Sequence, residues 1–386
     1  MGKEASRGLE LQRFQNNWVN YLTQNFDGGK FGMFKKVKYL LVISMLLIVP
    51  LLFAACGSDS SSTAASQDSQ DVAPTTLKLG DSQFESLWIN NALLKYVVEA
   101  AYGHTVTPVT MTTPVMQESL ANGEIDIMLE GWQQNIIDWY NEEIEAGRIE
   151  NRGMIYEGGP QFFAIPQWVH DEYGITTVDD MKQHVSLFPH PEGGSKGAFY
   201  NCVIGWQCEQ INTVKMEAYG LTEMYEIISP GSSAALDAAL AGPQKRNEPV
   251  FGYYWAPTAL MGMFDWYILE EPVYNDDCWA KVTAAREDES LRPIDEACAY
   301  QTLPVDVLAN TGLEAKAPLV HELLGKFMVG LEGINRTAAW FNENEKTDYK
   351  DAAVYYLRTF TDNAKTWMPA DRWAKVQAVL DAEDEL

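Results

Sequence analysis

Apolar and polar positions follow strand and helix periods in turn along the chain. TLKLGD at 76–81 is typical of a buried strand, and the amphipathic stretch at 87–103, which ends in a glycine, is typical of a helix. A strand near 105–109, a helix near 114–122 and a strand at 125–129 follow. This order predicts an α/β fold with a mostly parallel sheet and helices on its faces.

A second α/β set begins after the strand pattern at 162–169, in which Pro166 marks the expected boundary. An apolar strand pattern returns at 303–310, and the chain after it is helical to its end. The chain would thus cross between two lobes twice, near 163–167 and near 303–306. This predicts a discontinuous first lobe with a second lobe inserted into it. We expect lobe I to comprise 76–166 and 303–386, and lobe II to comprise 167–302.

The N-terminal segment does not fit a globular pattern. Lysines precede an uncharged run at 39–55, and small residues, Cys56 and a Ser-rich stretch follow. This order is typical of a secretory signal, and the run is at the short limit for a transmembrane helix. We expect an N-terminal extension and signal over 1–55 and a flexible tether over 56–75. An uncleaved anchor helix and a buried helix are the alternatives.

LFAAC, which ends at Cys56, resembles a bacterial lipoprotein box, in which the cysteine becomes the lipidated first residue of the mature chain. Phe53 stands where leucine is usual. The resemblance implies a protein anchored to the cell membrane by lipid on Cys56, on the extracytoplasmic face.

Export permits disulfides, and the cysteine count fits them. With Cys56 assigned to lipid, four cysteines remain, and four cysteines allow three pairings. We expect Cys202–Cys208 and Cys278–Cys298, because each pair closes a short local loop. Free buried thiols are the alternative.

The formal charge is −26, from 54 acidic and 28 basic residues. This balance argues against nucleic acid as a partner, because phosphate binding needs clustered lysine and arginine. It identifies no ligand, and we expect a monomer.

Three tryptophans stand apart from the others. Trp132, Trp206 and Trp255 each adjoin a glycine, a proline or a tyrosine pair at a predicted strand end or turn. Large aromatic side chains at such places are costly to leave in water. Three rings that converge from different loops would hold a quaternary ammonium group by cation–π attraction, since that cation has no N–H to donate.

A predicted helix at 207–220 begins beside the second of these tryptophans. The N–H groups of Trp206, Gln207 and Cys208 would be unsatisfied there and would lie at the positive end of the helix dipole. A ligand carboxylate could bind to them without any arginine. A Cys202–Cys208 bridge would hold the turn in place.

Three motifs carry a family resemblance: DIMLEGWQQN, FYNCVIGWQC followed by INTVKMEAYGL, and EPVFGYYWAP. Over roughly 76–380 the chain resembles the substrate-binding proteins of osmoprotectant ABC transporters, of the glycine betaine, proline betaine and choline type. The resemblance implies a two-lobed periplasmic-binding-protein fold of type II. It also implies a tryptophan cage that matches Trp132, Trp206 and Trp255.

The resemblance extends to the turn between two cysteines. In several relatives the backbone amides of a C…GWGC bend grip the ligand carboxylate, which implies this role for the amides of Gln207 and Cys208. The second glycine of that bend is Gln207 here, and Ile204 replaces the usual proline or glycine before GW.

Four further side chains are candidates for the site. Trp88 resembles a family position that joins it, and Tyr253 and Tyr254 alternate along a strand, so only one of them can face inward. Glu130, beside Trp132, would suit the positive charge of choline. The alternative interpretation is that Glu130 is a surface carboxylate that points outward.

The sequence therefore predicts a receptor that captures a glycine betaine-like compound between two lobes and delivers it to the permease of an ABC transporter. Choline, carnitine or an amino acid are alternative ligands, although the candidate loops lack the arginine typical of amino acid sites.

An enzyme is the more distant alternative, and we expect none. GGSKG at 193–197 satisfies the G-x-S-x-G pattern around Ser195, but polar, proline-containing sequence stands where a hydrolase has a buried strand. We expect no cofactor and no metal, because C-x5-C without a histidine pair lacks the spacing of metal ligands.

Overall fold

The computed structural model describes residues 72–383 of the chain. The predicted extension and signal segment, the lipidation site Cys56 and most of the tether lie outside the described residues. Within the described part, no helix is long and apolar enough to cross a membrane.

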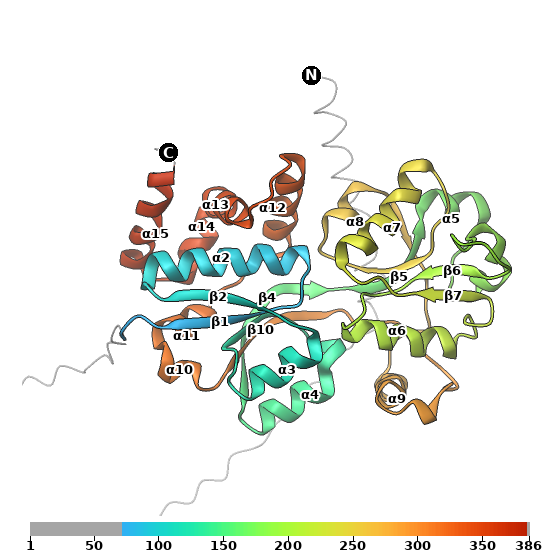
Figure 1. The fold of residues 1–386 in the computed structure, drawn as a ribbon, viewed down its shortest axis with the longest axis horizontal. Helices are drawn as coiled ribbons and strands as arrows, with labels where there is room; N and C mark the ends of the chain where they lie inside the picture. Colours follow the sequence, from blue (N-terminus) through green and yellow to red (C-terminus); the bar gives the residue numbers. More distant parts are fainter. Residues whose placement is uncertain (1–71, 384–386) are drawn as a thin grey trace, which may run out of the picture. The chain divides into compact units, whose positions relative to one another are not determined.

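The first sheet has five strands in the order β2-β1-β3-β10-β4 (Figure 1). β1 pairs parallel with β2 and β3, whereas β10 pairs antiparallel with β3 and β4. The strands are β1 (Thr76–Asp81), β2 (Thr105–Thr110), β3 (Ile127–Trp132), β4 (Ile149–Gly159) and β10 (Leu303–Asn310).

Helices cover both faces of this sheet. α2 lies on one face with helices of the C-terminal segment against it, and α3 and α4 lie on the other face (Figure 1). The α2 helix ends at Gly103, whose φ of 73° is the left-handed cap conformation that favours glycine. The helices are α2 (Glu85–Tyr102), α3 (Thr113–Ala121), α4 (Gln133–Glu145), α10 (Leu313–Lys316), α11 (Pro318–Leu324), α12 (Leu331–Glu343), α13 (Tyr349–Thr359), α14 (Thr361–Ala364) and α15 (Ala370–Glu383).

The second sheet repeats this plan in the order β7-β6-β8-β5-β9. β6 pairs parallel with β7 and β8, and β5 pairs antiparallel with β8 and β9. Its strands are β5 (Gln161–Pro166), β6 (Gly197–Tyr200), β7 (Tyr225–Ile228), β8 (Gly252–Trp255) and β9 (Trp266–Ile268). Its helices are α5 (Gln167–Tyr173), α6 (Gln207–Ala218), α7 (Ser233–Arg246), α8 (Ala259–Met263) and α9 (Asp276–Glu287).

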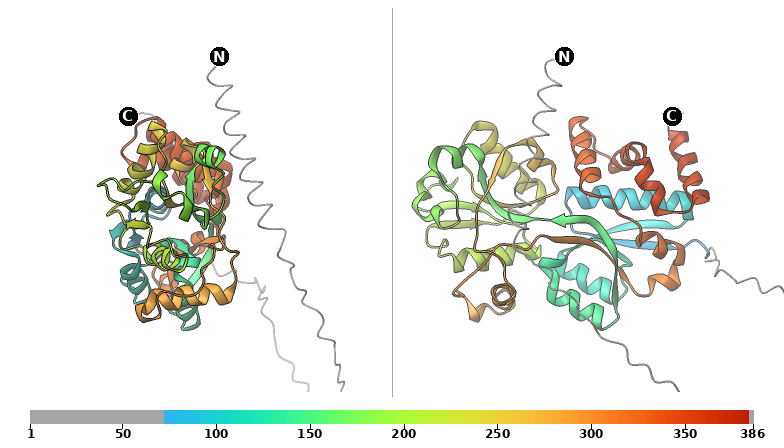
Figure 2. Two further views of the ribbon diagram at one scale, coloured as in Figure 1. Left: turned by 90° about the vertical axis from the view of Figure 1, so that its right-hand side faces the viewer. Right: turned by 180° about the vertical axis from the view of Figure 1, so that it is seen from behind.

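Two chain segments connect the sheets, as the views in Figure 2 show. β5 follows β4 directly and enters the second sheet, and β10 brings the chain back into the first. Because each connecting strand enters its sheet in the reverse direction, both sheets are mixed. The other four strands of each sheet point the same way, in agreement with the predicted mostly parallel sheets. The two-lobed α/β architecture itself is the predicted one.

The position of the first crossing differs from the expected boundary at Pro166. The whole strand Gln161–Pro166 pairs with β8 and β9 of the second sheet. On sheet membership we propose lobes that comprise residues 76–160 with 303–383, and 161–302.

The apolar pattern explains the strands that position the site. In β1, Leu77 and Leu79 are fully buried between the helix layers, and every residue of β5 is buried. β1 and β10 have the bounds that their patterns predicted.

Candidate ligand-binding site

Ends of several elements of both sheets converge on one cavity. It lies where β1 and β3 of the first sheet approach β8 and the start of α6. The residues that line it are Ser82, Phe84, Thr113, Met116, Met128, Glu130, Trp132, Asn135, Ile136, Gln161, Trp206, Gln207, Cys208, Tyr253 and Trp255.

The structure brings most of the predicted site residues to this cavity. All three tryptophans line it, together with Glu130, Tyr253, Gln207 and Cys208.

Two predicted candidates lie elsewhere. Trp88 is in α2 and its ring packs against Tyr349, with centroids 5.4 Å apart. The Tyr254 hydroxyl donates a hydrogen bond to Asp237, and Tyr254 does not line this cavity. Alternation along β8 explains the second case, because Tyr253 and Trp255 share a face that Tyr254 cannot.

An aromatic wall forms the side of the cavity that the second sheet supplies. The ring centroids of Trp206 and Trp255 are 5.4 Å apart at 79°. Tyr253 lies nearly parallel to Trp255, with centroids 6.1 Å apart. The wall therefore rests on edge-to-face and stacked contacts between its own members, which fix the ring orientations before any ligand arrives.

Phe84 completes this wall, and sequence reasoning missed it. Its centroid lies 5.4 Å from that of Trp206 and 6.3 Å from that of Trp255. It precedes α2 in the loop after β1, so the first-sheet side supplies this ring. The signal that could have found it is its place three residues after the C-terminal residue of a buried strand, where ligand sites of open sheets lie.

Trp132 lies on the other side of the cavity, at the end of β3. Its indole Nε1 donates a hydrogen bond to Glu130 at 3.1 Å. The ring passes close over the backbone of β4: a Cβ at Gly159 would come within 2.6 Å of the Trp132 ring. Only glycine at this position leaves room for the ring in the place observed.

Glu130 is the most unusual group of the site. Its side chain accepts hydrogen bonds from Ser86 at 3.3 Å, Asn90 at 2.8 Å and Tyr156 at 3.1 Å, besides that from Trp132. The residue is 3% exposed, so the alternative of an outward surface carboxylate is wrong. Burial raises the pKa of Glu130 to about 7, because a low-dielectric surrounding disfavours the carboxylate.

The cavity contains no cation that would neutralise Glu130. No lysine, arginine or histidine lines it, and among residues 72–383 no ion pair to Glu130 is formed. Four donors hold the side chain in place, and the positive charge that would stabilise its ionised form is missing from the described part of the chain.

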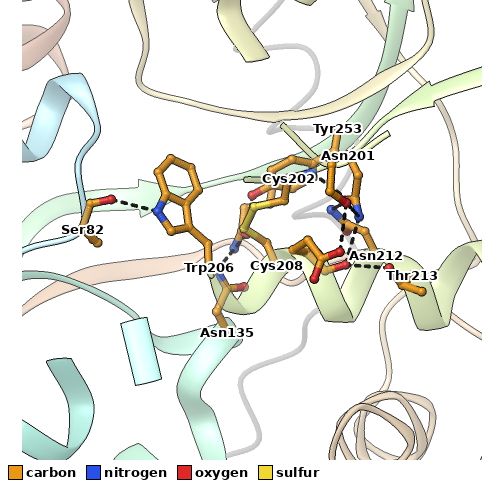
Figure 3. Close-up of a disulfide and its surroundings, with 12 residues drawn as sticks. Ser82, Asn135, Asn201, Cys202, Trp206, Cys208, Asn212, Thr213 and Tyr253 are labelled. Atoms are coloured by element: carbon orange, nitrogen blue, oxygen red, sulfur yellow. Dashed lines mark hydrogen bonds between the residues drawn. A yellow bond between two sulfur atoms is a disulfide. The ribbon is translucent and has the colours of Figure 1, made fainter. Parts of the chain in front are cut away.

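The N-terminus of α6 supplies hydrogen-bond donors. The helix begins at Gln207 after an extended Trp206, and the Cys202–Cys208 disulfide spans this turn (Figure 3). The amides of Gln207 and Cys208 have no partner among the described residues. The third predicted amide does have one: the N–H of Trp206 donates to the carbonyl of Val203 at 3.1 Å. This tight turn was not evident from sequence spacing.

Both predicted disulfide pairings are present. Cys202 is joined to Cys208, and Cys278 is joined to Cys298. The first fixes the start of α6 against the loop that carries Trp206. The second ties α9 to the segment that leads into β10.

Hydrogen bonds already connect the two sides of the cavity. Trp206 Nε1 donates to the carbonyl of Ser82 at 2.8 Å, as Figure 3 shows. The Ser233 hydroxyl donates to the carbonyl of Gln83 at 3.0 Å. The loop before α2 is thus held by elements of the second sheet, which places Phe84 against the wall.

Two amide side chains orient the tyrosine of the wall. Gln161 Oε1 accepts a bond from the Tyr253 hydroxyl at 2.8 Å and another from Asn135 Nδ2 at 3.0 Å. Both residues line the cavity and were missed from the sequence, since a polar residue at a strand or helix start has no distinctive local pattern.

The motif around Ser195 does not have the arrangement of a hydrolase. Ser195 lies in an exposed turn before the strand β6, whereas a nucleophile elbow requires a strand before the serine and a helix after it. Among the described residues, no group of three or more His, Cys, Asp and Glu is placed to hold a metal ion.

Residues 75–359 match the family described as the substrate binding domain of the ABC-type glycine betaine transport system. The chain belongs to this family. The match spans both sheets and every element that lines the cavity.

Individual relatives agree with the family. The chain is 26% identical over 189 residues to the glycine betaine-binding periplasmic protein OusX of Dickeya dadantii, which is 48% of this chain and 54% of that protein. It is 22% identical over 284 residues to the glycine betaine/proline betaine-binding periplasmic protein of Escherichia coli, 72% of this chain and 82% of that one. It is 21% identical to the trimethylamine N-oxide-binding protein of Pelagibacter ubique, over 73% and 87% of the two chains.

Solved structures share the fold of this substrate-binding domain. The glycine betaine/L-proline-binding protein ProX of Borrelia burgdorferi superposes with a TM-score of 0.62 at 21% identity, over 78% of this chain and 99% of that one. An ABC-transporter choline binding protein in complex with choline gives 0.62 at 19% identity, over 79% and 98%. These likenesses establish the two-lobed binding-protein fold.

Proposed function

We propose that this substrate-binding domain belongs to an extracytoplasmic receptor that captures a small quaternary ammonium compound and delivers it to the permease of an ABC transporter. The observation that carries the proposal is that Trp132, Trp206 and Trp255, from three separate segments, line one cavity. Glycine betaine is the ligand that the set of side chains favours.

Cation–π attraction is the basis for the ammonium end of the ligand. A fully methylated nitrogen has no N–H to donate, so the electron-rich faces of indole rings suit it better than hydrogen-bond acceptors. Each desolvated contact contributes about 2 kcal/mol or more. Three indoles with Phe84 and Tyr253 nearby supply enough faces to surround the methyl groups.

The start of α6 suits the carboxylate end. The free amides of Gln207 and Cys208 lie at the positive end of the helix dipole and line the same cavity as the indoles. A zwitterion whose ammonium nitrogen and carboxyl carbon are two bonds apart could therefore use both features at once, and no arginine is needed.

Choline is a second candidate, favoured by Glu130. A ligand with a net positive charge would supply the counter-charge that this buried carboxylate lacks. Carnitine and trimethylamine N-oxide share the methylated nitrogen, and relatives of the chain are named for glycine betaine, proline betaine and trimethylamine N-oxide.

Ligand binding would stabilise the approach of the two lobes, because the cage takes walls from both of them. We further propose that the protein is a monomer held at the membrane by lipid on Cys56. Metabolic labelling with a clickable fatty acid tests the anchor: label should be incorporated by the wild type and lost in Cys56→Ser.

Calorimetric titration with glycine betaine, choline, carnitine and proline tests the ligand class. We expect heat of binding with the methylated compounds and a much weaker affinity in Trp206→Ala. A receptor that ignored every methylated compound and bound proline alone would contradict the proposal.

A further inference from the structure

A second cavity, of about 220 Å³, adjoins the aromatic wall. It shares Phe84 and Trp255 with the ligand-binding cavity, so these two rings stand between the spaces. Helices and a turn from both lobes line it: the start of α2 and one side of α12 from the first lobe, and α7 and the β8–α8 turn from the second. The family assignment does not account for this space.

Two carboxylates from opposite sides line the second cavity. Glu85 belongs to α2 and accepts a hydrogen bond from Asn342 Nδ2 at 2.7 Å. Asp237 belongs to α7 and accepts one from the Tyr254 hydroxyl. No lysine, arginine or histidine lines the cavity, and within residues 72–383 neither carboxylate forms an ion pair.

Burial and mutual repulsion disfavour the ionised forms of these two carboxyl groups. Burial raises the pKa of Glu85, and the nearby charge of Asp237 raises it further. Burial likewise raises the pKa of Asp237. Like charges that face each other across an interface, partly removed from water, disfavour that interface unless a cation or a proton intervenes.

The remaining lining selects the kind of cation. Phe84, Tyr254 and Trp255 line the cavity, and aromatic rings attract an alkylated ammonium group. A divalent metal ion would require more oxygen ligands than two carboxylates, and the described residues contain no cluster of three suitable groups. The space is also larger than a bare metal ion needs.

We propose that this cavity is a second binding site, for a small organic ammonium ion, whose occupation neutralises Glu85 and Asp237 and holds the two sides of the cleft together. The proposal does not require that the first cavity bind glycine betaine. It uses a different pair of polar groups, and only two rings are common to both sites.

Calorimetric titration of the full-length protein with tetramethylammonium chloride tests the second site. The variants are Asp237→Asn and Glu85→Gln, which keep the side-chain volumes, and Trp132→Ala, which alters the first cavity alone. Asp277→Asn is the matched control for loss of one charge, because Asp277 is exposed on α9 and forms no side-chain hydrogen bond or ion pair among the described residues. Thermal unfolding of each variant verifies that it folds.

Because the first cavity also suits this ion, the charge variants are compared in the Trp132→Ala background. We expect tetramethylammonium binding to persist in Trp132→Ala alone and with Asp277→Asn added, and to weaken about tenfold when Asp237→Asn or Glu85→Gln is added. Binding that is lost in Trp132→Ala and unchanged in both carboxylate variants would assign the ion to the first cavity and overturn the proposal. Absence of binding to any form would overturn it as well. Failure of the proposed ligand class would appear separately, as a lack of glycine betaine binding.

Discussion

Each lobe contains a buried ionisable group among aromatic rings, and only one of the two has an oppositely charged partner. In the second lobe, Lys215 of α6 is fully buried, with Nζ 2.7 Å from Glu271 and 4.8 and 4.2 Å from the ring centroids of Phe163 and Tyr300. In the first lobe, Glu130 is buried beside Trp132 with no cation near it.

The Lys215 cluster is complete within the chain: a cation, a carboxylate and two rings. The Glu130 region has the carboxylate and the rings, and it lacks the cation. The comparison supports the proposal that the cavity around Glu130 receives a positive group from outside, whereas the Lys215 cluster already contains its own cation.

The largest expected effect is on stability and comes from removing the cation of the Lys215 cluster. Lys215→Met would leave Glu271 buried without its counter-charge, which typically costs about 3–5 kcal/mol of the free energy of unfolding. Urea unfolding followed by circular dichroism measures it.

Lys281→Met is the control for that variant. Lys281 is half exposed in its pairs with Asp295 and Glu296, so we expect a loss below about 1 kcal/mol. Equal losses in the two variants would show that burial of the Lys215 pair is energetically unimportant.

The next largest effect is on ligand affinity at the cavity that contains Glu130. Trp206→Ala removes one cage wall and the indole donor to Ser82, and we expect glycine betaine affinity to fall about thirtyfold, or about 2 kcal/mol. Trp88→Ala is the matched control, since it also removes an indole side chain but at a position in α2 that does not line the cavity. Isothermal titration that found the larger loss in Trp88→Ala would place the ligand elsewhere.

Choline binding should depend on pH through Glu130. The pKa of Glu130 is raised to about 7 by burial, so the group is mostly protonated at pH 6 and mostly ionised at pH 8. Only the ionised form attracts the ligand cation, so choline affinity should rise with pH, by up to about tenfold across that range.

Glu130→Gln separates this effect from others. The variant should bind choline about equally at pH 6 and pH 8, and at pH 8 about tenfold more weakly than the wild type. A wild-type affinity for choline that fell with rising pH would contradict the assigned role of the carboxylate.

The smallest effect concerns the position of Trp132. Gly159→Ala would place a Cβ within 2.6 Å of both the Trp132 ring and the Val305 side chain. The ring must shift, and we expect a severalfold loss of glycine betaine affinity with about 1 kcal/mol lower stability. Gly158→Ala, whose Cβ would meet only a Thr302 methyl at 3.2 Å, is the control and should bind nearly as the wild type does.

The sequence predicted the parts of the site that have local signals. Trp132, Trp206 and Trp255 stand beside glycine, proline or tyrosine pairs at element ends, and alternation on β8 showed that Tyr253 and Tyr254 could not both face inward. The boundaries of β1 and β10 followed from their apolar patterns.

The remaining features depend on contacts between distant segments. Phe84 joins the wall only because Ser233 and Trp206 hold the loop before it, and Ser86 and Asn90 reach Glu130 across the helix–sheet interface. The pairing of β5 with the second sheet could not be predicted either, since an apolar strand pattern does not specify which sheet receives it.

The most direct test of the central claim is a crystal structure of the protein with glycine betaine bound. We predict that the methylated nitrogen lies within about 6 Å of the ring centroids of Trp132, Trp206 and Trp255, with the carboxylate at the start of α6. Glycine betaine found outside this cavity, or in it with the carboxylate against the indole rings, would contradict the account.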